Sequence, residues 1–124
     1  MHQLMILAMA ASYDPDPTVP FGIRLPVTEN TCEIIADRWQ NWLAWDPVRM
    51  IDQHEAQKSL QSLKGLFIDC GSRDQYNLVY GARQFTEKLR ILGIDHRYEE
   101  FPDNHSSVDY RMDISLPYLY DAIT

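Results

Sequence analysis

This sequence lacks most of the features that would assign it to a specialised class of protein. It contains no run of about 18 apolar residues, the length that a membrane-spanning helix requires, so we expect no membrane partner. Lysine and arginine are outnumbered by aspartate and glutamate, 11 to 18, and they form no basic stripe. Because the resulting net charge of -7 repels nucleic-acid phosphates, we expect no nucleic-acid partner.

Cysteine and glycine are also scarce. The two cysteines, Cys32 and Cys70, provide no disulfide framework and favour a reducing, cytoplasmic location. Cys70 closes an apolar run, which predicts a buried free thiol. No glycine-rich phosphate loop is present, so we expect no nucleotide cofactor; the candidate glycines are too far apart, at Gly71, Gly81 and Gly93.

The N-terminal quarter combines an apolar segment with a proline-rich one. Met1–Ala11 lacks the positively charged leader of a secretory signal, so we interpret Met1–Tyr13 as a helix. Its almost continuous apolar character predicts that neighbouring elements cover it on more than one side. The segment Asp14–Pro26 contains four prolines and predicts an extended connection that lies against the body of the protein.

A helix is predicted over roughly Glu33–Trp45, with Thr28 or Thr31 as a candidate N-cap. The spacing places Trp39 and Trp42 on one face. Core packing is the simpler interpretation of these tryptophans, although a buried indole N–H also needs a partner. The functional alternative is that Trp42 forms part of the wall of a substrate pocket.

Two further helical regions flank the central part of the chain. One is predicted from Pro47 to about Leu60, with Asp46 as N-cap and proline at the first helical position. Near the C terminus, Ser107–Ile114 is predicted to be helical, and a separate last helix restarts at Ser115–Pro117 because an interior proline breaks the hydrogen-bond ladder. We therefore divide a single domain into residues 1–62, helical and cap-like with the proline-rich connection, and residues 63–124.

The second part contains a predicted βαβ unit. Leu66–Cys70 is a short apolar run closed by a glycine, which predicts a strand, and His96–Phe101 predicts a second strand stopped by a proline. Between them, Leu78–Leu92 carries apolar residues at alternating spacings of four and three, the pattern of one helical stripe. Asn77 is a candidate N-cap and Gly93 a candidate left-handed residue after the helix. A crossover of this length predicts parallel strands and an α/β fold.

One acidic and one basic side chain follow the two predicted strands. Asp74 lies in the loop after the first strand, and His105 lies in the loop after the second. Ligands and catalytic groups gather outside the carboxyl ends of parallel strands, so we expect these two residues to meet there. An aspartate can hold an imidazole in the tautomer needed for acyl transfer and stabilise the imidazolium that forms. The order of aspartate before histidine is the second half of the order seen in α/β-hydrolases.

The motifs IDCGSRDQYNL, RYEEFPDNHSSVDYRMD and the earlier DPVRM resemble the C-terminal portion of bacterial esterases of the α/β-hydrolase superfamily. The resemblance runs through nearly the whole chain and is densest from Asp46 to Asp113. It implies a partial α/β-hydrolase fold, in which a βαβ unit follows cap-like helices and precedes a C-terminal helix. It also implies that Asp74 is the triad acid and His105 the triad histidine of an enzyme that cleaves small-molecule esters.

The chain departs from that family in one respect. None of its seven serines, at positions 12, 59, 62, 72, 106, 107 and 115, lies in a G-x-S-x-G nucleophile elbow. We therefore expect the chain alone to be inactive and to be the C-terminal part of a longer esterase whose nucleophile and oxyanion hole lie upstream. The alternatives are a non-catalytic binding or oligomerisation module and a two-chain enzyme completed by a separate N-terminal half.

Several residues near the predicted site keep alternative interpretations. Arg73, Gln75 and Tyr76 crowd the acid loop, where each either orients Asp74 or lines the pocket, with Tyr76 as a candidate substrate-binding residue. Asp69, inside the strand, is interpreted as a structural hydrogen-bonding acid, and Ser106 and Ser107 as caps of the following helix. A metal site built from Asp103, His105 and Asp109 matches no strong ligand spacing, so no metal is expected. Two strands alone make a poor sheet, so we also predict self-association or pairing with a missing N-terminal half.

Overall fold

The computed structural model describes residues 2–124, with side chains from Leu4 onward. It combines helices with strands: six α-helices and one two-stranded parallel sheet occur in these residues. The chain forms two compact units, one up to Met50 and one from Ile51 to Thr124. None of the helices in the described residues has both the length and the apolar character that a bilayer crossing requires.

The first unit begins with α1 (His2–Tyr13), as predicted; Met1 lies outside the described residues. The expectation that α1 is covered on more than one side is wrong. Ala10 is fully buried, but Leu4 is 71% exposed and the next three side chains are each more than 40% exposed. The helix contributes little more than its C-terminal turn to the packing of its own unit.

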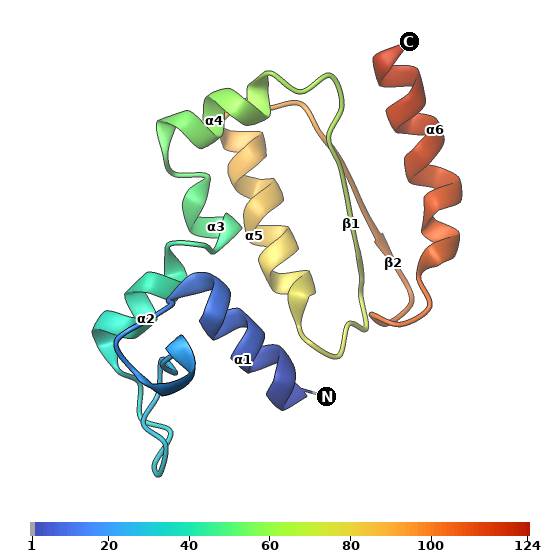
Figure 1. The fold of residues 1–124 in the computed structure, drawn as a ribbon. Helices are drawn as coiled ribbons and strands as arrows, with labels where there is room; N and C mark the ends of the chain where they lie inside the picture. The colour runs from blue at the N-terminus through green and yellow to red at the C-terminus, as the bar shows by residue number, and fades with distance from the viewer. Residues whose placement is uncertain (1) are drawn as a thin grey trace. The chain divides into compact units, whose positions relative to one another are not determined.

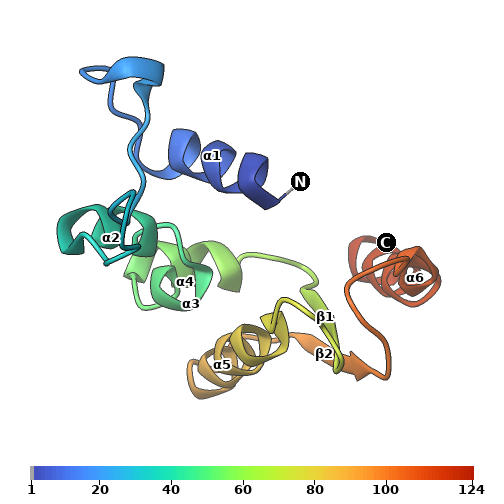
Figure 2. The same cartoon turned by 90° about the horizontal axis from the view of Figure 1, so that it is seen from below.

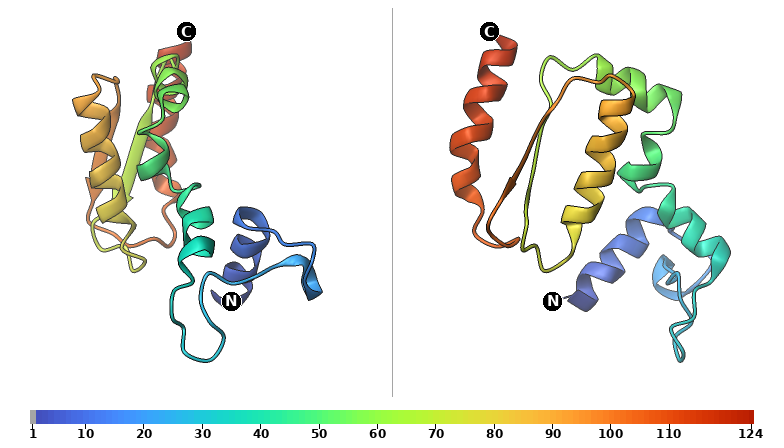
Figure 3. Two further views of the ribbon diagram at one scale, coloured as in Figure 1. Left: turned by 90° about the vertical axis from the view of Figure 1, so that its left-hand side faces the viewer. Right: turned by 180° about the vertical axis from the view of Figure 1, so that it is seen from behind.

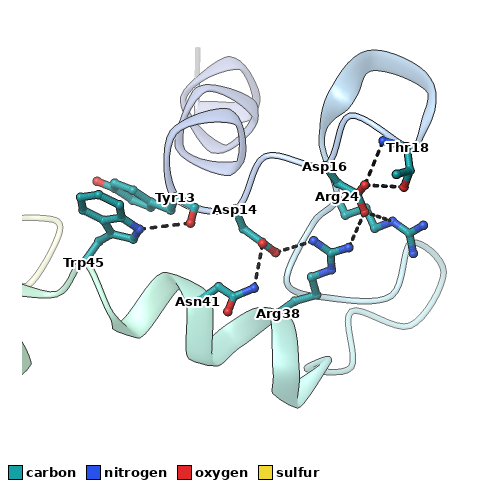
Figure 4. A network of polar contacts seen from close by, with 8 residues as sticks. All are labelled: Tyr13, Asp14, Asp16, Thr18, Arg24, Arg38, Asn41 and Trp45. Carbon is teal, nitrogen blue, oxygen red and sulfur yellow. Dashed lines mark hydrogen bonds and ion pairs between the residues drawn. The ribbon is translucent and has the colours of Figure 1, made fainter.

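The proline-rich connection holds its shape through charge pairs with α2 (Ala36–Leu43). It is not the extended connection that was predicted: it includes a short 3-10 turn, η1 (Pro20–Gly22), and folds back on itself, so that Pro15 pairs antiparallel with Ile23. The Arg38 guanidinium lies between the carboxylates of Asp14 and Asp16, at 2.8 and 2.6 Å (Figure 4). Asn41, one turn further along α2, donates to the second oxygen of Asp14 at 2.8 Å. These contacts hold the connection against α2, in agreement with the prediction that it lies against the body of the protein.

The prediction of a helix over Glu33–Trp45 is correct only for its centre. Residues before α2 pair instead with the preceding segment: Thr28 donates its N–H to the Glu33 carbonyl at 2.9 Å, and Ile35 donates to Pro26. The Thr28 hydroxyl closes this turn by accepting the Glu33 N–H at 3.1 Å, so it does not cap the helix. This local, hairpin-like pairing satisfies backbone groups that a helix would otherwise have used, and it delays the helix start to Ala36.

The predicted helix over Pro47–Leu60 is also divided, into α3 (Pro47–Met50) and α4 (His54–Gln61). Asp46 begins α3 as expected, because its carboxylate accepts the Val48 N–H at 2.9 Å. At the break, Ile51 turns fully into the core, and its carbonyl accepts the side-chain amide of Gln57 at 3.0 Å. Burial of Ile51, together with this replacement hydrogen bond, favours the break over a continuous helix.

The second unit is built around the predicted βαβ unit, and its parallel pairing is confirmed. β1 (Phe67–Gly71) pairs with β2 (Arg97–Phe101) in parallel register, from Phe67 opposite Arg97 to Gly71 opposite Phe101. The crossover helix is α5 (Leu78–Ile91), and Gly93 adopts φ +66° after it, as predicted. Asn77 precedes the helix in a left-handed conformation and makes no side-chain cap.

The two helices α5 and α6 (Met112–Ile123) lie on opposite faces of this small sheet (Figures 1, 2 and 3). Successive side chains of β1 point to opposite faces of the sheet, one toward each helix. Ile68 packs with α5 in the core, whereas the Phe67 ring meets the Tyr118 ring of α6 at 5.6 Å. The core consists of three buried side chains and the partly buried ones around them: Ile51, Leu89 and Ile94, with Leu60, Leu66, Ile68, Phe85 and Leu92.

The prediction of a helix restart at Ser115–Pro117 is wrong. After a short 3-10 turn, η2 (Asp109–Arg111), α6 runs through Pro117 without interruption. A Cβ placed on Gly65 would lie 2.7 Å from the Ala122 side chain and 3.5 Å from that of Tyr118. This close packing of the C-terminal half of α6 against Gly65 and β1 offsets the hydrogen bond that the exposed Pro117 cannot make.

Candidate active site

The acid loop places Asp74 directly beyond the end of β1. Its side chain is only 1% exposed, and Oδ1 accepts the backbone N–H of Tyr76 at 2.7 Å. The Asp74 N–H bonds the Gly71 carbonyl at 3.1 Å, which closes a tight turn at the strand end. Local backbone geometry thus directs the second carboxylate oxygen, Oδ2, away from the turn.

His105 meets that second oxygen from the loop after β2. Its ring nitrogen Nδ1 lies 2.9 Å from Asp74 Oδ2. A carboxylate can only accept, so Nδ1 carries the proton, which leaves Nε2 as the basic nitrogen of the neutral ring. The His105 side chain is 52% exposed, in contrast to the buried carboxylate. The structure therefore brings together the two residues that the sequence analysis singled out.

The electrostatics of the pair favour an ionised aspartate. Burial by itself raises the pKa of the Asp74 carboxyl, but the hydrogen bonds from His105 and the Tyr76 backbone outweigh it, so the pKa lies below its ordinary value. The carboxylate is thus available to orient an imidazole and to stabilise its protonated form.

The two loops are joined by backbone contacts as well as by the side-chain pair. Ser72 donates its N–H to the Phe101 carbonyl at 2.8 Å, and Arg73 donates to the Asp103 carbonyl at 3.0 Å. This approach is so close that a Cβ on Gly71 would lie 2.4 Å from the Asp103 carbonyl oxygen. From the sequence, Gly71 was predicted only to end the strand. In the structure it also lets the two loops approach, because any side chain at this position would clash with the histidine loop.

A cavity of about 220 Å³ lies beside the Asp74–His105 pair. Apolar side chains supply part of its wall: Leu78, Ala82, Phe101 and Val108. The polar part comes from the pair itself and from Asp69, Cys70 and Asn104. Leu78 and Ala82 belong to the predicted apolar stripe of α5, but they line this cavity and are not members of the core. The first two residues of the stripe thus line the cavity, and the last three, Phe85, Leu89 and Leu92, pack in the core.

The two candidate substrate-binding residues belong to different compact units. Tyr76 contacts the histidine directly, with its ring edge-on to the His105 imidazole at a centroid distance of 5.2 Å. Trp42 belongs to the first compact unit, where it is 92% buried and packs against Tyr13 and Trp39. Its indole nitrogen has no hydrogen-bond partner among the described residues. These contacts match the core-packing interpretation of Trp42.

No serine completes a triad within the described residues. Ser106 is adjacent to the histidine, but its hydroxyl is contacted by the Gln75 amide at 3.4 Å, and no serine hydroxyl is hydrogen-bonded to the His105 ring. The prediction that Ser106 and Ser107 cap a helix is wrong. Ser107 adopts φ +56°, and the turn that follows begins after Val108 without a side-chain cap.

Cys70 is the other side chain near the pair that could in principle act as a nucleophile. It is buried and reduced, as predicted, and its sulfur lies 3.9 Å from Asp74 Oδ2. Burial raises the pKa of the Cys70 thiol, and the Asp74 charge raises it further. Because the reactive form is the thiolate, this environment makes Cys70 a poor nucleophile.

Two residues of this region were not assigned by the sequence analysis. Gln75 was left with several possible roles, and its side chain contacts the histidine loop. Arg111 was missed; its guanidinium is 12% exposed and binds Asp69 at 2.9 Å and Glu99 at 2.5 Å, joining β1 to β2. The partner of Asp69 agrees with its interpretation as a structural acid. In the sequence, Arg111 is a single basic residue beyond the histidine loop, and no motif or spacing distinguishes it.

The carboxylate of Asp103, one of the three residues of the metal alternative, makes other contacts. Asp103 uses its carboxylate locally, for the Asn104 N–H at 2.8 Å and the Tyr110 hydroxyl at 3.3 Å. Among the side chains that the structure describes, from Leu4 onward, no three histidine, cysteine, aspartate or glutamate residues gather in a way that could hold a metal ion.

Neither a protein-family model nor a curated protein sequence matches this chain.

Proposed function

We propose that this chain forms the C-terminal part of a serine carboxylic-ester hydrolase with a partial α/β-hydrolase fold. In this proposal Asp74 and His105 are the acid and base, and the serine and oxyanion hole lie on a segment outside the 124 residues. The observation that carries the proposal is the 2.9 Å contact between the buried Asp74 carboxylate and the half-exposed His105 ring, beyond two parallel strands.

The geometry supports the following division of labour. Asp74 fixes the tautomer in which Nε2 is basic, and Nε2 removes the proton from a serine hydroxyl as that oxygen attacks the ester carbonyl. The imidazolium then gives the proton to the departing alkoxide, which leaves an acyl-enzyme and an alcohol. Water, deprotonated by the same nitrogen, then attacks the acyl-enzyme; the carboxylic acid leaves, and the imidazolium returns the proton to the serine oxygen.

The exposed apolar surface of α6 supports a partner for this chain. Three of its residues, spaced four and three apart, are each 58–64% exposed: Leu116, Tyr120 and Ile123. The free edge of β1 adds unpaired backbone groups on a strand with apolar character. Both surfaces suit a missing N-terminal half, whether it belongs to the same polypeptide or to a second one. The substrate would be a small uncharged ester, held at the cavity beside the pair.

The test begins upstream of the Met1 codon, where an in-frame strand, G-x-S-x-G motif and helix are expected. The encoded longer protein, or the chain mixed with a separately produced N-terminal half, should hydrolyse p-nitrophenyl acetate. His105→Ala should abolish this activity, and Asp74→Asn should lower kcat by roughly 10⁴-fold because the ring tautomer is lost.

His54→Gln provides a matched control. His54 is an exposed histidine at the start of α4, so its replacement should leave hydrolysis unchanged. The 124-residue chain alone should show no turnover above background. Hydrolysis by the chain alone that disappears in His105→Ala would contradict the proposal.

The second candidate function is a non-catalytic binding or oligomerisation module, and the exposed stripe of α6 favours it. It predicts that the chain self-associates through this stripe and that the assembly stays inactive with any N-terminal half. Sedimentation velocity of the wild type and of Ile123→Asp distinguishes the cases. A concentration-dependent dimer that Ile123→Asp abolishes, together with inert mixtures, would support the module.

A further inference from the structure

Three consecutive residues of the acid loop contact His105 at three different points. Asp74 binds the ring nitrogen, Tyr76 meets the ring edge-on, and Gln75 binds the backbone. The Gln75 side-chain oxygen accepts the His105 N–H at 3.0 Å. Ring and backbone of one histidine are thus held by neighbouring residues from a loop 30 positions earlier in the chain.

Gln75 spans two successive residues of the histidine loop. Its amide nitrogen lies 3.4 Å from the Ser106 hydroxyl, while its oxygen holds the His105 N–H. Both Gln75 and His105 are exposed, so water could satisfy the same backbone group. The direct bond therefore adds little to core stability, and its main effect is to fix the distance between the two loops.

The remainder of the histidine loop is held mostly by its own short-range bonds. The Asn104 side chain accepts the Ser106 N–H at 2.7 Å, and Ser107 adopts a left-handed backbone conformation. Such bonds shape the loop but do not set its position relative to Asp74. Ser72 and Arg73 tie the acid loop to the backbone of Phe101 and Asp103, whereas Asp74 and Gln75 provide side-chain hydrogen bonds to His105 itself.

We propose that Gln75 is a positioning residue for His105: it anchors the histidine backbone so that Nδ1 stays on Asp74 Oδ2 and Nε2 stays free. Its role as an aid to catalysis rests on the proposed esterase function, whereas the positioning itself is a property of this chain alone. Gln75 acts through the histidine and need not touch the substrate.

The experiment follows the Nδ1 proton of His105 by NMR in the ¹⁵N-histidine-labelled 124-residue chain. The proton is assigned by its loss in Asp74→Asn, which removes the anionic acceptor. Gln75→Ala should accelerate exchange of this proton with water by about 2- to 10-fold, the change expected when one neutral hydrogen bond is lost. Gln75→Glu keeps the acceptor oxygen at the same reach and should restore slow exchange.

Ser106→Ala is the matched control. This variant lacks the 3.4 Å contact to Gln75 but keeps the bond from the His105 N–H to Gln75. The Nδ1 proton of His105 should therefore exchange with water at the wild-type rate. Backbone amide spectra verify that each variant is folded. If Gln75→Ala proves unfolded, the folded Gln75→Glu variant still tests the proposal. Fast exchange of the His105 Nδ1 proton in that variant would contradict it.

Unchanged exchange in a folded Gln75→Ala would overturn the positioning role, as would equal acceleration in Ser106→Ala. Neither result depends on ester hydrolysis, so failure of the positioning role is distinct from failure of the proposed function. In an active assembly, Gln75→Ala should lower kcat with little change in KM, and Gln75→Glu should recover most of the loss.

Discussion

Gly71 lies where the acid loop and the histidine loop approach most closely, and its replacement by alanine tests this approach directly. The added Cβ would lie 2.4 Å from the Asp103 carbonyl oxygen and 2.8 Å from that of Asn104. Both neighbours are backbone atoms, so no side chain can rotate out of the way. The backbone of Gly71 does not have a positive φ, so the requirement for glycine is steric and not conformational.

The magnitude follows from the contacts that must yield. Overpacking a tight site costs about 1–3 kcal/mol. Moving the loops apart also weakens the hydrogen bonds from Ser72 to Phe101 and from Arg73 to Asp103, at about 0.5–1.5 kcal/mol each. We therefore expect Gly71→Ala to lower the free energy of unfolding by about 2–6 kcal/mol, a large fraction of the stability of a small domain.

Urea unfolding followed by far-UV circular dichroism measures this loss, and the Nδ1 proton of His105 reports the separation of the pair. Gly81→Ala is the control, because Gly81 lies within α5 and its Cβ would meet no atom within 4 Å. The free energy of unfolding of that variant should be higher than that of the wild type by about 0.5–1 kcal/mol, because alanine has a higher helix propensity than glycine. If Gly71→Ala retains both the wild-type stability and the wild-type proton signal, the close-approach argument is wrong.

Three further predictions concern the core, the titration of the site and the first unit. Leu89→Ala should lower the free energy of unfolding by about 2–5 kcal/mol in urea titrations, because Leu89 is fully buried. Ile91→Ala, at a position 69% exposed, should change it by less than about 0.5 kcal/mol, and equal losses would contradict the assigned core. Because the folded-state pKa of Asp74 lies below the ordinary 3.8, its ionised form stabilises the fold above that pH and the benefit is lost as pH falls through the folded pKa. The stability difference between wild type and Asp74→Asn should therefore shrink as pH falls from about 5 through the folded-state pKa of Asp74; a difference that grows over that range would refute the sign. Arg38→Met should lower the urea midpoint of the first unit, measured by the fluorescence of the three tryptophans, which all lie between residues 39 and 45. Arg24→Met, which removes one ion pair from a half-exposed side chain, should lower it less, and the reverse order would contradict the network in Figure 4.

Elements with strong local patterns were predicted well. The stripe in residues 78–92 and the glycine after it identified α5 to within one residue. The first strand is displaced by one residue from its predicted position, and the second starts one residue later than predicted and ends as predicted. Predictions failed where long-range packing opposed a local rule. Burial of Ile51 divided the helix after Asp46, and contact with Gly65 carried α6 through Pro117. The apolar α1 was expected to be covered, yet most of it is exposed.

The order of strand, acid loop, helix, strand and histidine loop follows from periodicity and from punctuation by glycine and proline, which are local properties of the chain. That order alone placed Asp74 and His105 beyond the ends of neighbouring parallel strands. Only the folded chain shows that their side chains meet at 2.9 Å, that Gln75 holds the histidine backbone, and that Gly71 permits the approach. These contacts join residues about 30 positions apart, and their distances depend on how two loops close over a packed sheet. The spacing of residues along the chain does not predict these distances, because tertiary packing sets the side-chain geometry between loops.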